Sequence, residues 1–456
     1  MSGPILATGP ETEGLLRILL LQDFNTRIVV AGAMLLGAVG GLVGTFLMFR
    51  RRALIGDVLG HAMLPGVAGA FLLLQVLGFE RNLPGLLTGG AVAATLAGLM
   101  VLGLRKITRL GDDAVMAIVL SGFFGFGVVL LSIVQTTGGG GQAGLEDFVF
   151  GKTASMVTAD VVVIAIGGLG VAIVGSILFK DLGLLCFDES FSASIGRPSG
   201  LLDLVLLTMA VLTALIGLQA VGLVLVVAVM VIPPAAARFI TDDLRKTVLW
   251  SSGIGATGCW IGVTLSAVAP GLPAGAMIVL SMAGLFVVTL VLGGRRGLVP
   301  GWLLARRVRR RVGRDHLLRS MLEHRELTGE SEVAVETILG FRVWSAGEVS
   351  ASLRAGRRVG EVVEVEPGRW RLSERGELEA IALVRNHRLW EYYLLRHADI
   401  AASHVDRAAD RIEHVLDPVL VRSLEVEVGA AIGARAPESP HPLGDVASVE
   451  EPEPGG

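Results

Sequence analysis

The chain has 456 residues, a formal net charge of −3 at pH 7 and only two cysteines. Its composition changes near Gly293: 31 of the 293 residues up to that point are charged, against 50 of the 163 that follow. The first part is therefore predicted to be a membrane domain and the second a soluble one. Cys186 lies in a predicted loop and Cys259 in an apolar run, which excludes a disulfide framework and a cysteine metal site.

Apolar runs long enough to cross a bilayer, which takes about 20 residues each, recur along the membrane part. We predict nine of them, with eight or ten as the neighbouring alternatives. Residues 1–26 fit neither a cleavable signal peptide nor a span and are expected to lie at the surface. The predicted spans are 28–49, 60–78, 85–104, 113–135, 158–179, 201–218, 219–239, 247–268 and 272–293.

The basic residues of the predicted loops gather on one side of the membrane. Short cytoplasmic loops collect Lys and Arg, so this side is predicted to be the cytoplasm and the soluble part to be cytoplasmic. The opposite loops carry only Arg81 and Lys152, and one of them contains the glycine run 138–141. The basic residues on the predicted cytoplasmic side are Arg50, Arg51, Arg52, Arg105, Lys106, Arg109, Lys180, Arg197, Arg238, Arg245, Lys246, Arg295 and Arg296.

Asp57 and His61 form the first chemical signal along the chain, and His61 is the only histidine before Gly293. Residues four apart share one helix face, so this carboxylate and imidazole are placed to hold a divalent cation together. Ionisable groups at membrane depth are costly and are normally kept for ion or proton passage. The alternative is an Asp that caps the helix and a His that bonds a neighbouring carbonyl. Because the pair falls near the cytoplasmic end of its span, we expect a break in this helix, at the glycines and proline of residues 56–66.

No segment of the chain offers a nucleotide site. The string 150–153 looks like the end of a phosphate-binding loop, but Glu146 stands where the required glycine should be. Uphill transport then needs an ion gradient or a separate ATPase as its energy source. In the predicted cytoplasmic loop 180–198, Phe187, Phe191 and Ile195 repeat every four residues and form an apolar stripe on a polar surface. Such a stripe needs a partner protein, which favours a separate ATPase. The alternative is a helix that folds back on its own membrane domain.

Four ordered motifs stand out in the membrane part: 51–68, 145–151, 187–196, and 219–225 with 232–238. Over about residues 25–293 they resemble the zinc, manganese and iron-chelate ABC importer permeases. In that family the permease is a homodimer or pairs with a close relative, takes metal from an extracytoplasmic binding protein and is driven by cytoplasmic ATPase subunits. One departure is a second proline at 233–234. The resemblance implies a transport route through Asp57 and His61, and it implies ATPase coupling through Phe187, Asp188, Phe191, Ile195 and Gly196.

The soluble part begins with a basic juxtamembrane linker, residues 294–313, that is suited to anionic lipid. Residues 314–376 read as helices followed by a two-stranded hairpin, a pattern typical of a winged helix-turn-helix. Ser345 and Glu348 form a capping box at one helix start, and Gly356 is placed to end that helix. Such domains bind DNA in many proteins and serve as protein contacts in others, so DNA binding stays open here.

Histidines and carboxylates cluster in residues 377–425, which are predicted to be helical. His387 and Glu391 lie four residues apart, and the later cluster also has helical spacing, so each group occupies one helix face. Antiparallel packing of the two helices would join these faces in a nitrogen and oxygen site suited to Mn, Fe or Zn. The alternative is two polar faces with ordinary ion pairs. The candidate ligands are His387, Glu391, His404, Asp410, Glu413 and His414.

The strings 385–391 and 408–416 resemble the metal-sensing and dimerisation helices of the diphtheria-toxin-repressor type of iron- and manganese-dependent regulators. The resemblance covers about residues 314–425 and implies that the candidate residues are ligands of a regulatory metal. Asp406 competes with His404 for one position. The ligand that the family takes from its first helix has two candidates here, Asp315 and Met321. Residues 426–456, rich in Pro, Glu and Gly, are expected to be disordered.

The fold class predicted from the sequence is an all-α polytopic membrane protein, with about nine transmembrane helices in residues 27–293, followed by a cytoplasmic winged helix and a helical metal-sensing and dimerisation domain. The predicted function is a permease subunit, not itself an enzyme, of an ABC importer for Mn, Zn or Fe in the cell (inner) membrane. The chain would bind no nucleotide, and metal on its cytoplasmic domain would reduce further import. Expected partners are an ATPase subunit, an extracytoplasmic metal-binding protein and a second permease. Two alternatives remain: a membrane-tethered metal-dependent transcriptional regulator and an ion-driven secondary transporter.

Overall fold

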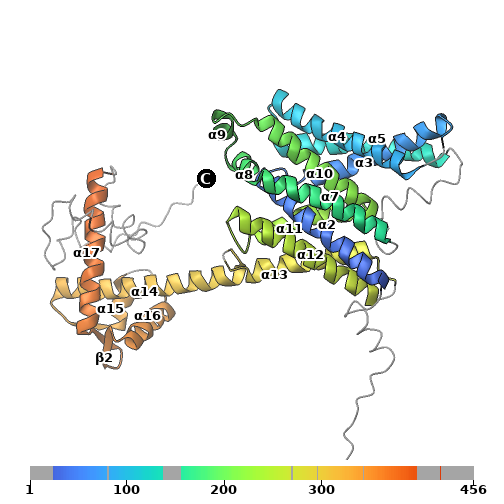
Figure 1. Ribbon diagram of the computed structural model, residues 1–456. Helices are drawn as coiled ribbons and strands as arrows, with labels where there is room; N and C mark the ends of the chain where they lie inside the picture. Colours follow the sequence, from blue (N-terminus) through green and yellow to red (C-terminus); the bar gives the residue numbers. More distant parts are fainter. Residues whose placement is uncertain are drawn as a thin grey trace, which may run out of the picture. The chain divides into compact units, whose positions relative to one another are not determined.

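The computed structural model describes residues 24–79, 82–136, 156–268, 271–294, 296–341, 344–397 and 422. The chain divides into two compact units, Met1–Gly301 and Trp302–Gly456, each with its own hydrophobic core (Figure 1). Most of the predicted surface segment 1–26 lies outside the described residues, as do the glycine run 138–141 and nearly all of the sequence beyond His397.

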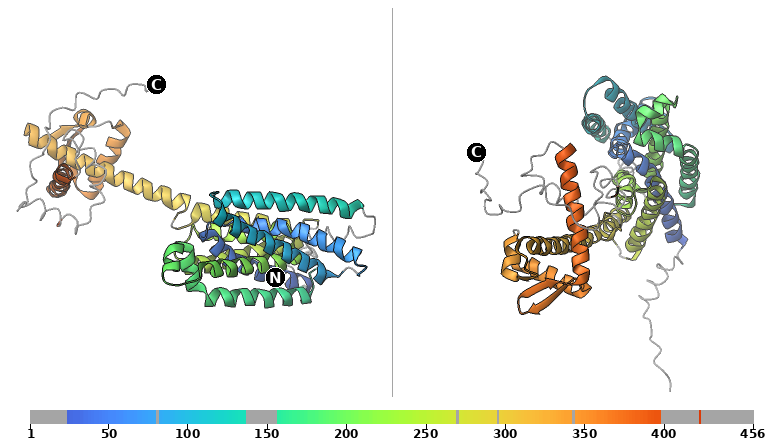
Figure 2. Two further views of the ribbon diagram at one scale, coloured as in Figure 1. Left: turned by 90° about the horizontal axis from the view of Figure 1, so that it is seen from above. Right: turned by 90° about the vertical axis from the view of Figure 1, so that its left-hand side faces the viewer.

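Long apolar helices that run alongside one another build the first unit (Figures 1 and 2). Eight helices in the described residues have the length and composition to cross a membrane, and they pack around one shared core, as in a multi-pass membrane protein. The helices are α2 (Phe24–Phe49), α3 (Ile55–Val76), α4 (Leu83–Ile107), α5 (Asp112–Thr136), α7 (Thr158–Ile177), α10 (Ser199–Val221), α12 (Leu244–Val268) and α13 (Ala274–Leu292).

The seventh predicted span, residues 219–239, does not form a helix of full length. Gly222 has a φ of 82° and separates α10 from α11 (Leu223–Ala237), which has 15 residues. Such a helix rises about 22 Å, less than the roughly 30 Å of a hydrocarbon core. It packs against α2, α12 and α13, so neighbouring protein covers it. The prediction of nine full spans is therefore wrong at this segment, and the described residues contain the lower alternative of eight.

Helix α3 is also more regular than expected, because it runs from Ile55 to Val76 without the break predicted around residues 56–66. Pro65 lies inside it, at a point where α5 comes very close. A Cβ added at Gly127 of α5 would stand only 2.8 Å from Cδ of Pro65. Asp57 therefore lies in the first turn of an intact helix, one turn before His61.

Small residues allow α2 and α12 to approach each other closely. A Cβ at Gly37 would stand 2.4 Å from the carbonyl oxygen of Gly255, and one at Gly41 would stand 2.5 Å from that of Ser251. The hydroxyl of Ser251 donates to the carbonyl of Gly41 at 2.8 Å. Helices that pack in a membrane gain from such close backbone contact, because lipid offers no hydrophobic driving force between them.

Two short helices, α8 (Phe179–Phe187) and α9 (Glu189–Ser194), connect α7 to α10. The sequence predicted one amphipathic helix through residues 187–195. Instead the backbone is extended at Asp188, whose carboxylate accepts a hydrogen bond from the amide of Phe191 at 2.8 Å and caps α9. The stripe is therefore divided between the end of α8 and the whole of α9.

In the second unit, helices precede a two-stranded hairpin, as predicted for a winged helix, and a further strand that was not predicted pairs with the hairpin from an earlier point in the chain. Its three antiparallel strands have the order β1-β3-β2, and the pairs Glu332↔Arg371 and Val362↔Leu372 set the register. The long helix α17 crosses α14 (Figure 1), and Leu318, Trp370 and Val384 belong to the core between these elements. The elements are α14 (Leu298–Thr328), β1 (Glu332–Ala334), α15 (Val335–Phe341), α16 (Ala346–Val359), β2 (Val362–Glu366), β3 (Arg369–Leu372) and α17 (Glu374–His397).

The two ends of α16 can be compared with the predicted capping box and the predicted helix end. Ser345 and Glu348 form the predicted capping box, which is confirmed by reciprocal hydrogen bonds of 3.3 and 3.0 Å. The helix does not end at Gly356 but at Gly360, which has a φ of 80°. Gly356 is instead a packing residue, since a Cβ there would stand 3.0 Å from Val362. The basic run predicted as a linker is helical, within α14.

Candidate functional site

Asp57 and His61 project from consecutive turns of α3 and contact each other. Nε2 of His61 lies 3.2 Å from Oδ1 of Asp57. The two side chains are 28% and 31% exposed, so a small ion can reach both. Leu54 is the N-cap of α3 and no side chain caps it, while His61 bonds a carboxylate rather than a carbonyl. The structure therefore contradicts the alternative of a capping Asp and a carbonyl-bound His.

The other ring nitrogen of His61, Nδ1, is buried and has no hydrogen-bond partner among the residues described. The edge of the ring faces Phe124 of α5, with centroids 5.1 Å apart. An imidazole and a carboxylate on one helix face are suitable ligands for a transition metal. The described residues offer two donors at this place, whereas such ions take four or more ligands, so the remaining ligands would come from elsewhere in the chain, from water or from another molecule.

The predicted coupling residues form an apolar surface at α8 and α9. Phe187, Phe191 and Ile195 are 64%, 52% and 51% exposed. Asp188 starts α9, as described above, and Gly196, with a φ of 80°, follows its end. The apolar side chains are thus exposed, and Asp188 and Gly196 mark the two ends of the short helix α9.

A buried cluster of ion pairs lies behind this surface. Asp203, in the first turns of α10, accepts hydrogen bonds from Arg50 at 3.1 and 3.2 Å and from Arg52 at 3.0 and 3.2 Å. The three side chains are 9%, 7% and 3% exposed. Buried charges are costly unless they are paired, so this cluster holds the link between α2 and α3 firmly against α10.

The same cluster reaches the predicted coupling helix. Glu189, the first residue of α9, lies 2.8 Å from Nη2 of Arg50 and 3.3 Å from Nη2 of Arg105. Arg105 in turn pairs with Asp112, the first residue of α5, at 3.0 Å. One connected network of charges therefore joins α9 to α4, α5, α10 and the link between α2 and α3. Arg52, its last residue in that link, lies five residues before Asp57 of the candidate metal pair.

This network is not among the features predicted from the sequence. Arg50 and Arg52 were assigned only to the basic side of the membrane, and Asp203 was not singled out. One feature of the sequence does point to it, because Asp203 is the one acidic residue in the predicted span 201–218. A carboxylate within an apolar run requires a partner.

The network also perturbs the groups around it. Burial alone would lower the pKa of Arg50, but hydrogen bonds and charges from Asp203 and Glu189 outweigh it and raise that pKa. Burial raises the pKa of the Cys186 thiol to about 12. The thiol lies 3.5 Å from the carbonyl oxygen of Phe46. Cys186 is therefore a weakly reactive group next to the network.

In the second unit, His387 and Glu391 are brought together on α17. They are 1% and 0% exposed, and Nε2 of His387 lies 3.1 Å from Oε1 of Glu391. Nη1 of Arg319, from α14, lies 2.9 Å from Nδ1 of the same ring. A guanidinium only donates, so Nδ1 accepts and the neutral ring carries its proton on Nε2, toward Glu391. The imidazole nitrogen and the carboxylate oxygen are donor atoms of the kinds that transition metals bind.

The other predicted ligands cannot be placed beside this pair. His404, Asp410, Glu413 and His414 lie outside the described residues, and within the described part no group of three or more His, Cys, Asp or Glu side chains is arranged to hold a metal. Both candidates for a ligand from the first helix have other contacts. The carboxylate of Asp315 pairs with Arg314 at 3.1 Å, and Met321 is part of the apolar core.

Comparison with known proteins agrees with this architecture. Residues 22–293 match the ABC 3 transport family, and residues 373–431 match the iron dependent repressor, metal binding and dimerisation domain. The chain is 31% identical over 387 residues to the manganese transport system membrane protein MntC of Bacillus subtilis, covering 85% of this chain and 88% of the relative. It is 34% identical over 289 residues to the zinc transport system membrane protein TroC of Treponema pallidum, covering 63% and 96%.

A solved structure is similar as well. PsaBC from Streptococcus pneumoniae, in complex with Fab, superposes with a TM-score of 0.52 at 25% identity, covering 62% of this chain and 96% of the other. The family match spans more than half of the chain, and it coincides with the region of the four sequence motifs. The chain therefore belongs to the ABC 3 transport family and carries a repressor-type metal-binding and dimerisation domain at its C-terminal end.

Proposed function

We propose that the chain is the permease subunit of an ABC importer for a divalent transition metal ion, Mn, Zn or Fe. The observation that carries the proposal is the contact between Asp57 and His61 on α3, in a helix bundle of this family. The pair offers one oxygen and one nitrogen donor to an ion that has lost part of its water shell. Two permease copies facing each other would offer four donors, enough for a tetrahedral site.

Energy for transport is proposed to come from a separate ATPase that docks on Phe187, Phe191 and Ile195. Apolar side chains exposed on a short surface helix favour a protein partner. Glu189 on the same helix is tied through Arg50 to the turn that precedes Asp57. Movement of α9 on ATP binding would thus be transmitted to the start of α3 through charged contacts rather than through a flexible loop.

The basic loops support an orientation with this ATPase surface and the C-terminal unit in the cytoplasm. An extracytoplasmic metal-binding protein would then deliver the ion at the opposite face. Inside the cell, His387 and Glu391 are proposed to bind regulatory metal together with His404, Asp410, Glu413 and His414. Metal bound to these residues would reduce further import, so that a high metal concentration in the cytoplasm limits uptake.

Metal uptake by cells tests the transport proposal. In a strain without other importers, the wild-type gene should restore accumulation of at least one of Mn, Zn and Fe, whereas Asp57→Asn and His61→Ala should each reduce it at least tenfold. Asp181→Asn is the matched control, because this acid forms a partly exposed pair with Arg197, on α8 rather than α3. Normal accumulation by both α3 variants, at equal expression, would refute the assigned route.

Regulation has its own test in proteoliposomes with the ATPase. Uptake by the wild-type complex should fall as free metal rises on the side of the C-terminal unit, and Glu391→Gln should require at least tenfold more metal for the same inhibition. Glu377→Gln serves as control, since Glu377 lies on the same helix but pairs with Arg325. Equal inhibition of all three proteins would remove the regulatory proposal and leave the transport proposal intact.

A further inference from the structure

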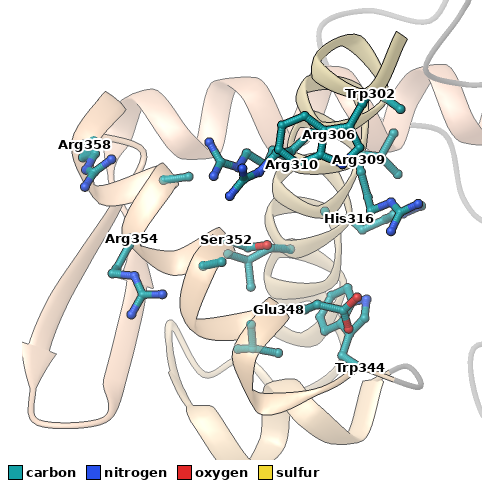
Figure 3. A pocket seen from close by; sticks show the side chains of 17 residues that line it. Trp302, Arg306, Arg309, Arg310, His316, Trp344, Glu348, Ser352, Arg354 and Arg358 are labelled. Carbon is teal, nitrogen blue, oxygen red and sulfur yellow. The ribbon is translucent and has the colours of Figure 1, made fainter. Parts of the chain in front are cut away.

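A groove between α14 and α16 in the second unit is lined by five arginines. It has a volume of about 800 Å³, within the range of sites for small ligands. Figure 3 shows arginines of both helices around it, together with Trp302 and Trp344. The lining arginines are Arg306, Arg309, Arg310, Arg354 and Arg358.

Helical spacing sets these arginines in two rows. Arg306 and Arg310 are four residues apart on α14, and Arg354 and Arg358 are four apart on α16, so each pair shares a face. The guanidinium of Arg306 lies over the ring of Trp302, 5.1 Å from its centroid, which restricts its position. The groove thus presents donors from two walls rather than a single basic stripe.

Within the described part of the chain, the positive charges of these five arginines form no ion pairs. Glu348 is the one acid in the lining, and hydrogen bonds from Ser345, with a smaller effect of Arg309, lower its pKa. By contrast, arginines that leave the same helices in other directions are paired: Arg314 with Asp315 at 3.1 Å, and Arg357 with Glu364 at 3.0 Å.

Unpaired arginines of like charge repel one another, and a bound anion would remove that repulsion. Guanidinium groups bind phosphate oxygens in a bidentate manner, and several together select a ligand with more than one negative charge. The two indole rings add flat apolar surface for the uncharged part of such a ligand. The lining therefore matches a phosphate-bearing compound better than a neutral or cationic one.

Duplex DNA fits this groove less well. A recognition helix must present its exposed face to the major groove, but on α16 that face, with Ala351, Arg354 and Arg358, is one wall of the hollow. The other wall, α14, approaches so closely that a Cβ at Gly313 would stand 3.1 Å from Oγ of Ser352. The neighbouring strand β2 exposes Glu364 and Glu366, which would repel DNA phosphates.

We propose that the groove between α14 and α16 binds a small multiply charged phosphate group, belonging either to a soluble phosphate compound or to the headgroup of an anionic phospholipid. The site is separate from the metal pair of α3 and from His387 and Glu391. It would make the state of the second unit depend on the phosphate compounds around it as well as on metal.

Binding to the full-length chain tests the site. Sodium pyrophosphate is titrated into the detergent-purified protein by calorimetry, and retention of phosphatidylglycerol against phosphatidylcholine is measured by native mass spectrometry. The double variant Arg310→Gln/Arg354→Gln should weaken whichever probe binds at least tenfold. The control Arg307→Gln/Arg357→Gln removes the same charge from the same two helices but outside the groove, and it should bind as wild type.

Each outcome decides the matter. Pyrophosphate binding that only the groove variant loses supports a soluble ligand, and selective loss of phosphatidylglycerol supports a lipid headgroup. Equal weakening by the two double variants would mean a diffuse basic surface and would overturn the proposal, as would the absence of binding by both probes. A 20-base-pair duplex provides the last test. If it binds tightly, is not displaced by pyrophosphate and is no longer bound by Arg354→Gln, then α16 binds DNA and the phosphate-site proposal is overturned.

Discussion

Replacing Asp203 by Asn removes one charge from the centre of the network behind α9. Arg52 then loses its only described counter-charge while its side chain stays 3% exposed, whereas Arg50 keeps Glu189 at 2.8 Å. Breaking a buried ion pair costs about 3–5 kcal/mol, because the remaining charge is desolvated without compensation. The amide oxygen of Asn still accepts a hydrogen bond, so we expect the lower end of that range, about 3 kcal/mol.

Thermal unfolding of the purified protein measures this loss. With roughly 2 °C per kcal/mol for a unit of this size, the melting temperature of Asp203→Asn should fall by about 6 °C. Asp181→Asn is the comparison, because its pair with Arg197 has an N–O distance of 3.3 Å and is more exposed, at 53% for Arg197 and 21% for Asp181. An exposed pair contributes about 1 kcal/mol or less, so this variant should melt within about 2 °C of wild type.

Function provides a second readout that a purely structural loss would not explain. If the network transmits movement from α9 to α3, the Asp203→Asn complex at a temperature well below its melting point should still hydrolyse ATP but import less metal per ATP. Arg52→Met combined with Asp203→Leu should recover stability, since apolar residues replace buried ion pairs at little cost, without recovering coupling. Unchanged melting and unchanged coupling in Asp203→Asn would refute the reasoning.

Further outcomes follow from other parts of the structure. Maleimide labelling of the folded protein at pH 8 should be slow, because a Cys186 pKa of about 12 leaves only about one thiol in ten thousand ionised and Cys259 is 1% exposed. Fast labelling would contradict the raised pKa of Cys186 or the burial of Cys259. Replacing Ser345 by Ala should destabilise the second unit by about 1 kcal/mol through loss of the cap, measured by its unfolding, while Ser350→Ala should have little effect. Gly37→Leu should prevent the close contact of α2 with α12 and abolish the folded permease in detergent, as seen by size-exclusion chromatography. Burial would raise the pKa of Glu189, but the hydrogen bond and charge of Arg50 outweigh this effect and lower it. A carboxylate with a lowered pKa stabilises the fold above its unfolded pKa, and this stabilisation is lost as the pH falls through the folded pKa. The contact between α9 and Arg50 should therefore weaken only in acid below the ordinary value of 4.5, which is detectable as faster Cys186 labelling after brief acid exposure.

Local properties of the sequence predicted most of the helices. Hydropathy located eight of the long helices, and the capping box of Ser345 and Glu348 placed the start of α16, because both signals depend on residues close together in the chain. The same reasoning failed at residues 219–239. Hydropathy is continuous there, whereas the backbone at Gly222 breaks the helix, and the packing around α11 made that break acceptable.

The candidate metal pair was predictable for the same reason, since Asp57 and His61 are one helical turn apart, and motif resemblance extended the prediction to the family. The sequence by itself thus determined a multi-pass permease with a repressor-type domain, together with its polar pair on α3 and the exposed apolar residues of α8 and α9. Only the tertiary structure decided that Asp203 binds Arg50 and Arg52, 153 and 151 residues away, and that two rows of arginine enclose a groove between α14 and α16. Electrostatic interactions depend on the distance between charges in space, and the periodicity of the local sequence does not predict which distant residues the fold brings together.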